Sequence, residues 1–264
     1  MKPLIHFAHA NGVPSKVYQK LFDALSDQFD VIAVPNLGVD PKYPVDQHWE
    51  SMTNQLIDNI EANSNGRKVI GIGHSLGGVL TFKASLIRPD LFSQNILLDP
   101  PLIVGVESFG FQIAKLLKLK IIDKMSPAAL SLRRRDHWES REQAADLLRP
   151  KALYQAFDRD CFNDYIQHGL VEDTSRGGVE LVIPKMTEVE IFRTNPSLWW
   201  KPQPKLTVPT HLIAASQGPF LGRKFPQKLD KKFGVPFSTF EGGHMFPLER
   251  PNELAQYLKQ LIEK

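Results

Sequence analysis

Short apolar runs alternate with amphipathic segments along the first hundred residues. Four runs rich in β-branched or other apolar residues predict strands, at Pro3–Ala8, Val31–Pro35, Lys68–Gly73 and Asn95–Asp99. Between them, Trp49–Ala62 and Leu76–Ile87 predict helices, because their apolar residues recur every three or four positions. Strands that alternate with helices in this way predict a parallel sheet with helices on both faces.

The alternation stops after residue 100. Strand patterns nearly vanish over residues 101–205, where the spacing of apolar residues predicts helices at Phe111–Met125, Arg141–Leu148 and Arg159–Gly169. Strand patterns then return, and a last helix is predicted with proline in its first turn; these elements are Pro209–Ala215, Pro236–Phe240 and Pro251–Glu263. We therefore expect an α/β core of about six strands, residues 1–100 and 206–264, with a mostly helical cap inserted at 101–205.

Composition places the chain among globular proteins, with 42% hydrophobic and 23% charged residues. The 32 Lys and Arg residues exceed the 29 Asp and Glu residues by only three, too few to predict a nucleic-acid partner. The single cysteine, Cys161, cannot form an internal disulfide, which favours a cytoplasmic location. No secretory signal is recognised, and no apolar run approaches the roughly 18 residues of a membrane span. The basic run Arg133–Arg135 is predicted to be a solvated face, with an anionic-substrate clamp as the alternative.

A serine stands at the turn between a predicted strand and a predicted helix. The segment Gly73–Gly77 reads G-H-S-L-G, a G-x-S-x-G pattern centred on Ser75. On so tight a turn the hydroxyl projects above the sheet, and the glycines two positions either side leave room for it. An ordinary glycine-rich turn is the alternative, but the strand–turn–helix position favours a nucleophile elbow. Neither of the common phosphate-binding glycine patterns is present.

A serine hydroxyl is a weak nucleophile unless a base accepts its proton. His244 follows the last predicted strand and precedes the last helix, so it belongs to the same edge of a parallel sheet as Ser75. Of the other seven histidines, two lie in predicted strands, one lies beside Ser75, one follows the first predicted strand and three are predicted surface residues; in that order they are His6 and His211, His74, His9, and His48, His137 and His168. None is spaced with carboxylates as a ligand cluster, so no catalytic metal is expected.

Together, Gly73–Gly78, His9–Gly12, Asp99 and Gly242–Pro251 resemble the α/β-hydrolase family, over nearly the whole chain. The resemblance implies a nucleophile, an acid and a histidine in that chain order, and an oxyanion hole of two backbone N–H groups. Matched to this sequence, those groups belong to Asn11 and Leu76. A plain turn of small residues is the alternative for His9–Gly12. The family usually has two strands before the first one predicted here, so a shortened sheet is expected.

The acid does not stand where the family most often has it. That place follows the penultimate strand, and Ser216–Pro219 contains no Asp or Glu. Asp99 ends the strand after the elbow, which resembles the arrangement in pancreatic-type lipases and some capped members. That resemblance implies an acid that orients His244. A purely structural Asp99 stays open, and Glu241 is the second candidate acid.

These residues predict a serine hydrolase, a carboxylic-ester hydrolase resembling lipases, that works through an acyl-enzyme. Ser75 attacks, His244 moves the proton, Asp99 orients the ring, and the N–H groups of Asn11 and Leu76 bind the oxyanion. Thioester or C–C bond hydrolysis on the same triad, and a non-catalytic small-molecule receptor, are the alternatives. No cofactor is required. The expected partner is a small, apolar acyl substrate, with no nucleic acid and no stable membrane insertion, and the oligomeric state is left open.

Overall fold

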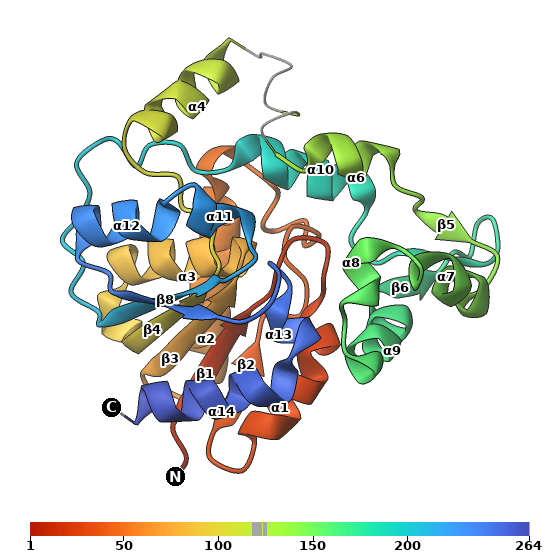
Figure 1. Ribbon diagram of the computed structural model, residues 1–264, viewed down its shortest axis with the longest axis horizontal. Helices are drawn as coiled ribbons and strands as arrows, with labels where there is room; N and C mark the ends of the chain where they lie inside the picture. The colour runs from red at the N-terminus through yellow and green to blue at the C-terminus, as the bar shows by residue number, and fades with distance from the viewer. Residues whose placement is uncertain (118–122, 124–125, 264) are drawn as a thin grey trace.

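The computed structural model describes residues 1–117, 123 and 126–263 of the chain (Figure 1). Six strands form one sheet in the order β2-β1-β3-β4-β8-β9, and every neighbouring pair is parallel. Their bounds are β1 (Leu4–Ala8), β2 (Asp30–Ala33), β3 (Val69–His74), β4 (Phe92–Leu98), β8 (Thr210–Ala215) and β9 (Phe237–Phe240). Each strand predicted from the sequence overlaps one of these six, so the predicted shortened α/β sheet is confirmed.

Helices cover both faces of this sheet (Figure 1). The helices around it are α1 (Gln19–Leu25), α2 (Glu50–Asn63), α3 (Leu76–Ile87), α11 (Pro219–Gly222), α12 (Phe225–Phe233), α13 (Phe246–Glu249) and α14 (Pro251–Ile262). Short 3₁₀ turns span Ser15–Tyr18, Gln47–Trp49 and Pro89–Leu91. On β1, Ile5 and Phe7 pack with α1 and α14, whereas Leu4 and Ala8 pack with α2 and α3. Both faces of the strand are thus buried, as expected for a parallel sheet between helical layers.

The segment between β4 and β8 lies over the carboxyl edge of the sheet (Figure 1). Its helices are α4 (Val106–Leu116), α6 (Ala128–Arg133), α7 (Arg141–Leu148), α8 (Ala152–Gln155), α9 (Arg159–His168) and α10 (Lys185–Thr194). The predicted helices at 141–148 and 159–169 are confirmed as α7 and α9. The helix predicted at 111–125 begins earlier, because Gly105, with φ +73°, turns the chain directly before Val106. Most of its predicted second half lies outside the described residues.

This insertion also contains a small antiparallel sheet that the sequence pattern did not predict. Its order is β5-β7-β6, and the strands are β5 (His137–Trp138), β6 (Leu170–Glu172) and β7 (Val179–Leu181). Strands of two or three residues are too short to show an alternation of apolar and polar positions, so the prediction of a mostly helical segment missed them. Across the described ranges, no helix combines the length and apolarity needed to cross a membrane.

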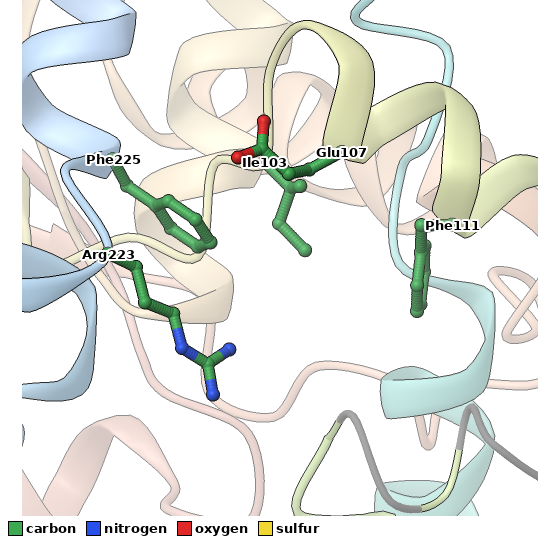
Figure 2. Close-up of a pocket in the computed structure, with 5 residues that line it drawn as sticks. All are labelled: Ile103, Glu107, Phe111, Arg223 and Phe225. Carbon is green, nitrogen blue, oxygen red and sulfur yellow. The ribbon is translucent and has the colours of Figure 1, made fainter.

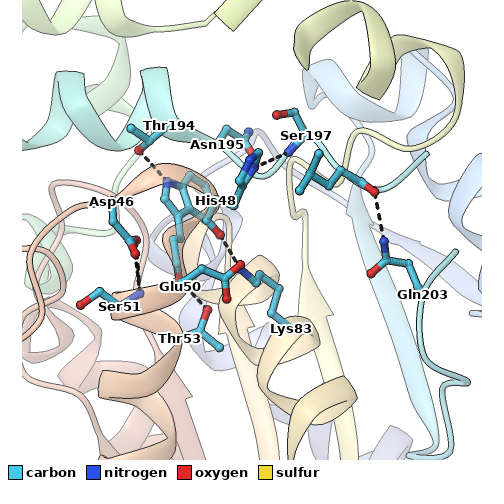
Figure 3. Close-up of polar contacts among 12 residues, drawn as sticks. Asp46, His48, Glu50, Ser51, Thr53, Lys83, Thr194, Asn195, Ser197 and Gln203 are labelled. Carbon is cyan, nitrogen blue, oxygen red and sulfur yellow. Dashed lines mark hydrogen bonds and ion pairs between the residues drawn. The ribbon is translucent and has the colours of Figure 1, made fainter. Parts of the chain in front are cut away.

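A hydrogen-bonded seam joins the end of the insertion to the loop before α2 (Figure 3). The backbone N–H of Ser197 donates to Nδ1 of His48 at 3.2 Å, and the indole N–H of Trp49 donates to Oγ1 of Thr194 at 3.1 Å. Lys83 of α3 donates to the carbonyl oxygen of His48. Positive φ angles of 66° and 60° at His48 and Trp49 turn this loop sharply. The end of the insertion is therefore fixed beside the helix that follows Ser75.

Candidate active site

Ser75 occupies the turn between β3 and α3 in a backbone conformation that L-residues rarely adopt, with φ 53° and ψ −112°. Two of its neighbours must be glycine for steric reasons. A Cβ atom on Gly73 would overlap the carbonyl oxygen of Gly77, and one on Gly77 would overlap the carbonyl oxygen of Ala8. Strand β1 and helix α3 thus approach each other at the elbow as closely as backbone atoms allow.

Replacing Gly77 by alanine is therefore expected to destabilise the protein by roughly 4 kcal/mol or more, because the overlap is with backbone that cannot move aside. Urea denaturation followed by circular dichroism measures the free energy of unfolding. Gly110, in the exposed part of α4, has nothing within 4 Å of its ideal Cβ and is the matched control. Gly110→Ala should raise stability by up to about 1 kcal/mol. Equal effects of the two substitutions would contradict this account of the elbow.

The structure brings Ser75, His244 and Asp99 into one hydrogen-bonded series. Nε2 of His244 lies 3.0 Å from Oγ of Ser75, and Nδ1 of His244 lies 2.7 Å from Oδ2 of Asp99. Since a carboxylate only accepts hydrogen bonds, Nδ1 carries the ring proton and Nε2 is left to accept from the serine hydroxyl. Only 1% of the Asp99 side chain is exposed, whereas the His244 ring is 28% exposed. The ring therefore reaches the serine from a position that a substrate can also approach.

Asp99 follows β4 directly and has a φ angle of 43°. Its Oδ1 accepts a hydrogen bond from the backbone N–H of Ala215, at the end of β8, at 3.1 Å. A Cβ atom on Gly218 would stand 2.9 Å from Oδ2 of Asp99. The segment after β8, which contains no acid, thus leaves room for the carboxylate that comes from β4. Glu241 instead forms an exposed ion pair with Arg250 at 2.6 Å.

The two candidate oxyanion donors also lie beside the serine. Asn11 and Leu76 line the same cavity as Ser75 and His244. Leu76 is the first residue of α3, where a backbone N–H has no acceptor within its own helix. The Asn11 loop follows β1, which pairs with β3, and the backbone N–H of Gly77 donates to the carbonyl oxygen of His9 at 3.1 Å. Both loops therefore meet at the carboxyl edge where the strand order reverses, the usual ligand site of an open α/β sheet.

A buried series of hydrogen bonds connects the Asn11 loop with the loop that carries His244. The backbone N–H of Ala10 donates to the Tyr18 hydroxyl at 3.2 Å, and that hydroxyl donates to Nδ1 of His74 at 2.8 Å. Nε2 of His74 then donates to the carbonyl oxygen of His244 at 2.9 Å. Burial holds the pKa of His74 well below its usual range, so the ring stays neutral and can accept at one nitrogen. Neither His74 nor Tyr18 was expected in the site from the sequence, where the position of His74 inside the G-x-S-x-G motif is the one indication of a role.

His9, the first residue after β1, is fully buried at the start of the Asn11 loop. Its Nε2 accepts from the backbone N–H of Leu37 at 2.8 Å, and its Nδ1 donates to the carbonyl oxygen of Ala10 at 2.8 Å. Burial lowers the pKa of His9 to about 4, because a charged imidazole would lose its hydration. Only the neutral ring satisfies both partners.

This burial predicts a loss of stability in acid. Between pH 6.5 and 4 the unfolded chain binds a proton at His9 that the folded chain does not, so the free energy of unfolding falls as the pH falls. His9 alone should contribute a loss of about 2 kcal/mol between pH 7 and pH 5. Urea denaturation at the two pH values measures it. His9→Asn should reduce the difference, whereas the exposed control His168→Asn should not; an unchanged difference in His9→Asn would refute the prediction.

A cavity of about 700 Å³ lies between the insertion and the carboxyl edge of the sheet, and Ser75 and His244 are part of its wall. Most of the wall is apolar or aromatic, and the insertion contributes Leu130, Leu148, Phe157, Tyr165, Ile191 and Phe192. Its size is within the range of pockets that enclose small organic ligands. Among the described residues, no group of three or more His, Cys, Asp or Glu side chains is placed to hold a metal ion.

A smaller cavity of about 300 Å³ adjoins the first, lined by Ile103, Glu107, Phe111, Arg223 and Phe225 (Figure 2). All of these residues except Glu107 also line the larger cavity. The smaller cavity is therefore a side branch of the larger one. It lies beneath α4, and three of its five lining side chains are apolar.

An ion pair is buried in the cavity wall beside the Asn11 loop. Arg134 contacts the carboxylate of Glu188 and donates to the Tyr165 hydroxyl at 2.8 Å. The carbonyl oxygen of Glu188 accepts from the side-chain amide of Asn11 at 3.0 Å, and a Cβ atom on Gly12 would overlap the Glu188 carboxylate. Burial raises the pKa of Glu188, an effect that Arg134 opposes. The sequence-based view of Arg133–Arg135 as a solvated face is thus wrong for Arg134, because its partner stands 54 positions away.

Comparison with curated proteins gives partial matches. The type I acyl-CoA thioesterase mpaH of Penicillium brevicompactum is 29% identical over 175 residues, which are 61% of this chain and 38% of that protein. The chain thus spans less than half the length of this curated relative. The aligned part is more than half of this chain.

Solved structures match over the whole fold. An E-2-(acetamidomethylene)succinate hydrolase superposes with a TM-score of 0.75 at 17% identity, covering 100% of this chain and 92% of that chain. The thioesterase domain from the curacin biosynthetic pathway gives a TM-score of 0.73 at 14% identity, covering 98% and 91%. The sequence profile described as the alpha/beta hydrolase family matches residues 7–257. With a match over nearly its full length, the chain belongs to the alpha/beta hydrolase family.

Proposed function

We propose that this chain is a serine hydrolase that cleaves a carboxylic ester or a related acyl compound through an acyl-enzyme on Ser75. The observation that supports it most directly is the hydrogen-bonded series from Asp99 through His244 to the Ser75 hydroxyl, with distances of 2.7 and 3.0 Å. That series ends in the wall of a cavity large enough for a small acyl compound.

In the proposed reaction, Oγ of Ser75 attacks the acyl carbon while Nε2 of His244 accepts its proton. The Asp99 carboxylate stabilises the imidazolium that forms and fixes its orientation. The backbone N–H groups of Asn11 and Leu76 bind the developing oxyanion, at about 3 kcal/mol for each donor. His244 then gives its proton to the leaving group. A water molecule activated by the same ring releases the acid and restores Ser75.

We further propose that residues 101–205 act as a cap on the core formed by 1–100 and 206–264. The cavity is enclosed from one side by Tyr165 and Phe192 of the insertion and from the other by Ser75 and His244. A mostly apolar wall suits an apolar acyl group. We also propose a cytoplasmic location. The single cysteine, Cys161, is buried and forms no disulfide, which fits a reducing compartment.

A thioester is the second acyl compound that we propose, because the matched relative from Penicillium brevicompactum is named an acyl-CoA thioesterase. The same three side chains would serve an ester and a thioester, since the attack and the oxyanion are alike. The leaving group differs, because a thiolate leaves more readily than an alkoxide.

The proposal is tested with p-nitrophenyl butyrate and with the butyryl thioester of N-acetylcysteamine. Wild-type protein should hydrolyse at least one of them and should be labelled by a fluorophosphonate at one site per chain. Peptide mass spectrometry should find that label on Ser75, and labelling should abolish turnover. Folded protein that binds acyl ligands tightly but shows neither turnover nor label would instead support the receptor alternative.

A further inference from the structure

Charge is unevenly distributed around the cavity that contains Ser75. Among the described residues, its wall includes four cationic side chains, Arg134, Arg135, Lys151 and Arg223, and a single acidic one, Glu188. Clefts lined by charge of one sign concentrate ligands of the opposite sign. Whether this cavity does so depends on which of the four cations already have an acidic partner.

The charge of Arg134 is already compensated. Its guanidinium forms the buried ion pair with Glu188, and the remaining contacts are with the Tyr165 and Tyr154 hydroxyls. This pair is therefore close to neutral as a unit. It also supports the Asn11 loop through the carbonyl oxygen of Glu188. We assign to it no role in binding charge.

The other three cations have no acidic partner among the described residues. Arg135 donates to the carbonyl oxygen of His137 at 2.7 Å and to the side chain of Gln143, which are both neutral groups. Lys151 and Arg223 have no side-chain hydrogen bond or ion pair in the described part of the chain. An excess of three positive charges thus remains on the exposed part of the cavity wall.

Arg223 has the most informative position of the three. It follows α11 and stands three residues after Phe220, whose ring contacts the ring of His244 with centroids 5.3 Å apart. It lines both the large cavity and the side branch. Figure 2 shows its side chain beside the Phe225 ring, with the guanidinium well apart from the Glu107 carboxylate. Glu107 is paired instead with Lys228 of α12.

A guanidinium in this place matches an oxyanion with two coplanar or clustered oxygens, such as a carboxylate or a phosphate. Lys151, on the insertion, presents a second positive charge to the same cavity, whereas Arg223 belongs to the segment after β8. Arg223 contributes an exposed and unpaired fork, so the anion would be held at the cavity mouth. The apolar wall would hold the rest of the ligand.

We propose that the substrate carries a negatively charged group, a carboxylate or a phosphate, and that Arg223 binds it at a distance from the bond that is cleaved. This inference rests on the proposed hydrolysis at Ser75, because it specifies the substrate class of that site. Arg223 is in this view a specificity-determining residue and takes no part in the bond-breaking steps.

Two pairs of aryl esters test the proposal. In the first pair the acyl group differs: the mono-p-nitrophenyl ester of glutaric acid carries a terminal carboxylate, and p-nitrophenyl pentanoate is its neutral partner. In the second pair the leaving group differs: 3-carboxy-4-nitrophenyl butyrate is anionic and p-nitrophenyl butyrate is neutral. Binding is measured by isothermal titration calorimetry with Ser75→Ala protein, so that the result does not depend on turnover. Hydrolysis by the protein with Ser75 intact gives kcat/KM.

At low salt, at least one anionic ester should bind about tenfold more tightly than its neutral partner, since a charge-assisted hydrogen bond is worth one to two decades of affinity. The advantage should shrink at 0.5 M salt, where exposed charges are screened. Arg223→Gln should remove most of the advantage and change binding of the neutral esters less than threefold. Lys224→Gln makes the same change of charge one residue further along, outside the cavity wall, and should leave the advantage intact.

The proposal is overturned if neither anionic ester binds more tightly than its neutral partner, or if Arg223→Gln and Lys224→Gln have equal effects. The two arms also show whether the anion belongs to the acyl group or to the leaving group. Serine-dependent hydrolysis of the neutral esters without any preference for an anion would leave the hydrolase proposal standing and remove this one. A preference in binding without hydrolysis of any ester would retain anion binding by Arg223 but remove the hydrolase proposal, and with it the claim that the bound anion is a substrate.

Discussion

Replacing Ser75 by alanine is expected to lower kcat for ester hydrolysis about a millionfold, as the loss of the serine does in other triad hydrolases. Alanine has no group that can form an acyl-enzyme, so the remaining rate reflects the oxyanion donors and water alone. The strained turn is held by the backbone of Gly73, Gly77 and Ala8, and alanine adds no atom that the serine lacks. The variant should therefore stay folded and keep its affinity for the substrate.

Initial rates with p-nitrophenyl butyrate measure this loss, and circular dichroism confirms the fold. Ser85→Ala is the matched control, because Ser85 is a buried serine of helix α3, which follows Ser75, and its hydroxyl donates to the carbonyl oxygen of Phe82. That control should keep its rate within a few-fold. A Ser75→Ala protein that retains more than a hundredth of the wild-type rate would exclude an acyl-enzyme on this residue.

Exchanging Asp99 for asparagine is expected to lower kcat by about 10⁴, the effect known for this substitution in a triad. An asparagine can still accept from the backbone N–H of Ala215 with its oxygen, which turns its amide N–H₂ group toward Nδ1 of His244. The ring proton would then move to Nε2. In that tautomer the ring can no longer accept the proton of Ser75.

The same variant separates an orienting acid from a purely structural one. An orienting Asp99 gives a large fall in kcat with a small change of KM and of the melting temperature. A structural Asp99 gives a loss of stability while the rate of the folded fraction changes less than tenfold. Glu241→Gln is the control for the second candidate acid, and it should leave kcat unchanged, since Glu241 is exposed and paired with Arg250.

The sheet and the elbow could be predicted from sequence because their signals are local. A strand buried on both faces is apolar along its length, and a serine between glycines at a strand–helix junction has few other uses. The carboxyl ends of parallel strands lie at the same edge of the sheet. Because Ser75, Asp99 and His244 each come at or just after the end of a predicted strand, the sequence already indicated that they lie on one side of the sheet. The structure now places these three within hydrogen-bonding distance.

Other parts of the site depend on contacts that leave no local trace. Gly218 looks like an ordinary loop glycine until the Asp99 carboxylate is seen beside it. Arg134 belongs to a run of three arginines whose pattern is that of a solvent-exposed face, and nothing in that run reveals its ion pair with Glu188. The strands of the insertion are too short for any periodicity. Predicting the contacts of Gly218 and Arg134 requires the relative positions of segments that lie 50 or more residues apart, as Arg134 and Glu188 do.

The hydrogen bond between Nε2 of His74 and the carbonyl oxygen of His244 links the two backbone segments that carry Ser75 and His244. His74 directly precedes Ser75, so a shift of the elbow is transmitted at once to the backbone that carries the imidazole. We expect Ser75 and His244 to move together in any rearrangement of the proposed cap. The distance between Ser75 and His244 would then stay constant while the cavity around them changes shape. Substitutions in the cavity wall would therefore alter which substrates bind without altering the proton transfer from Ser75 to His244.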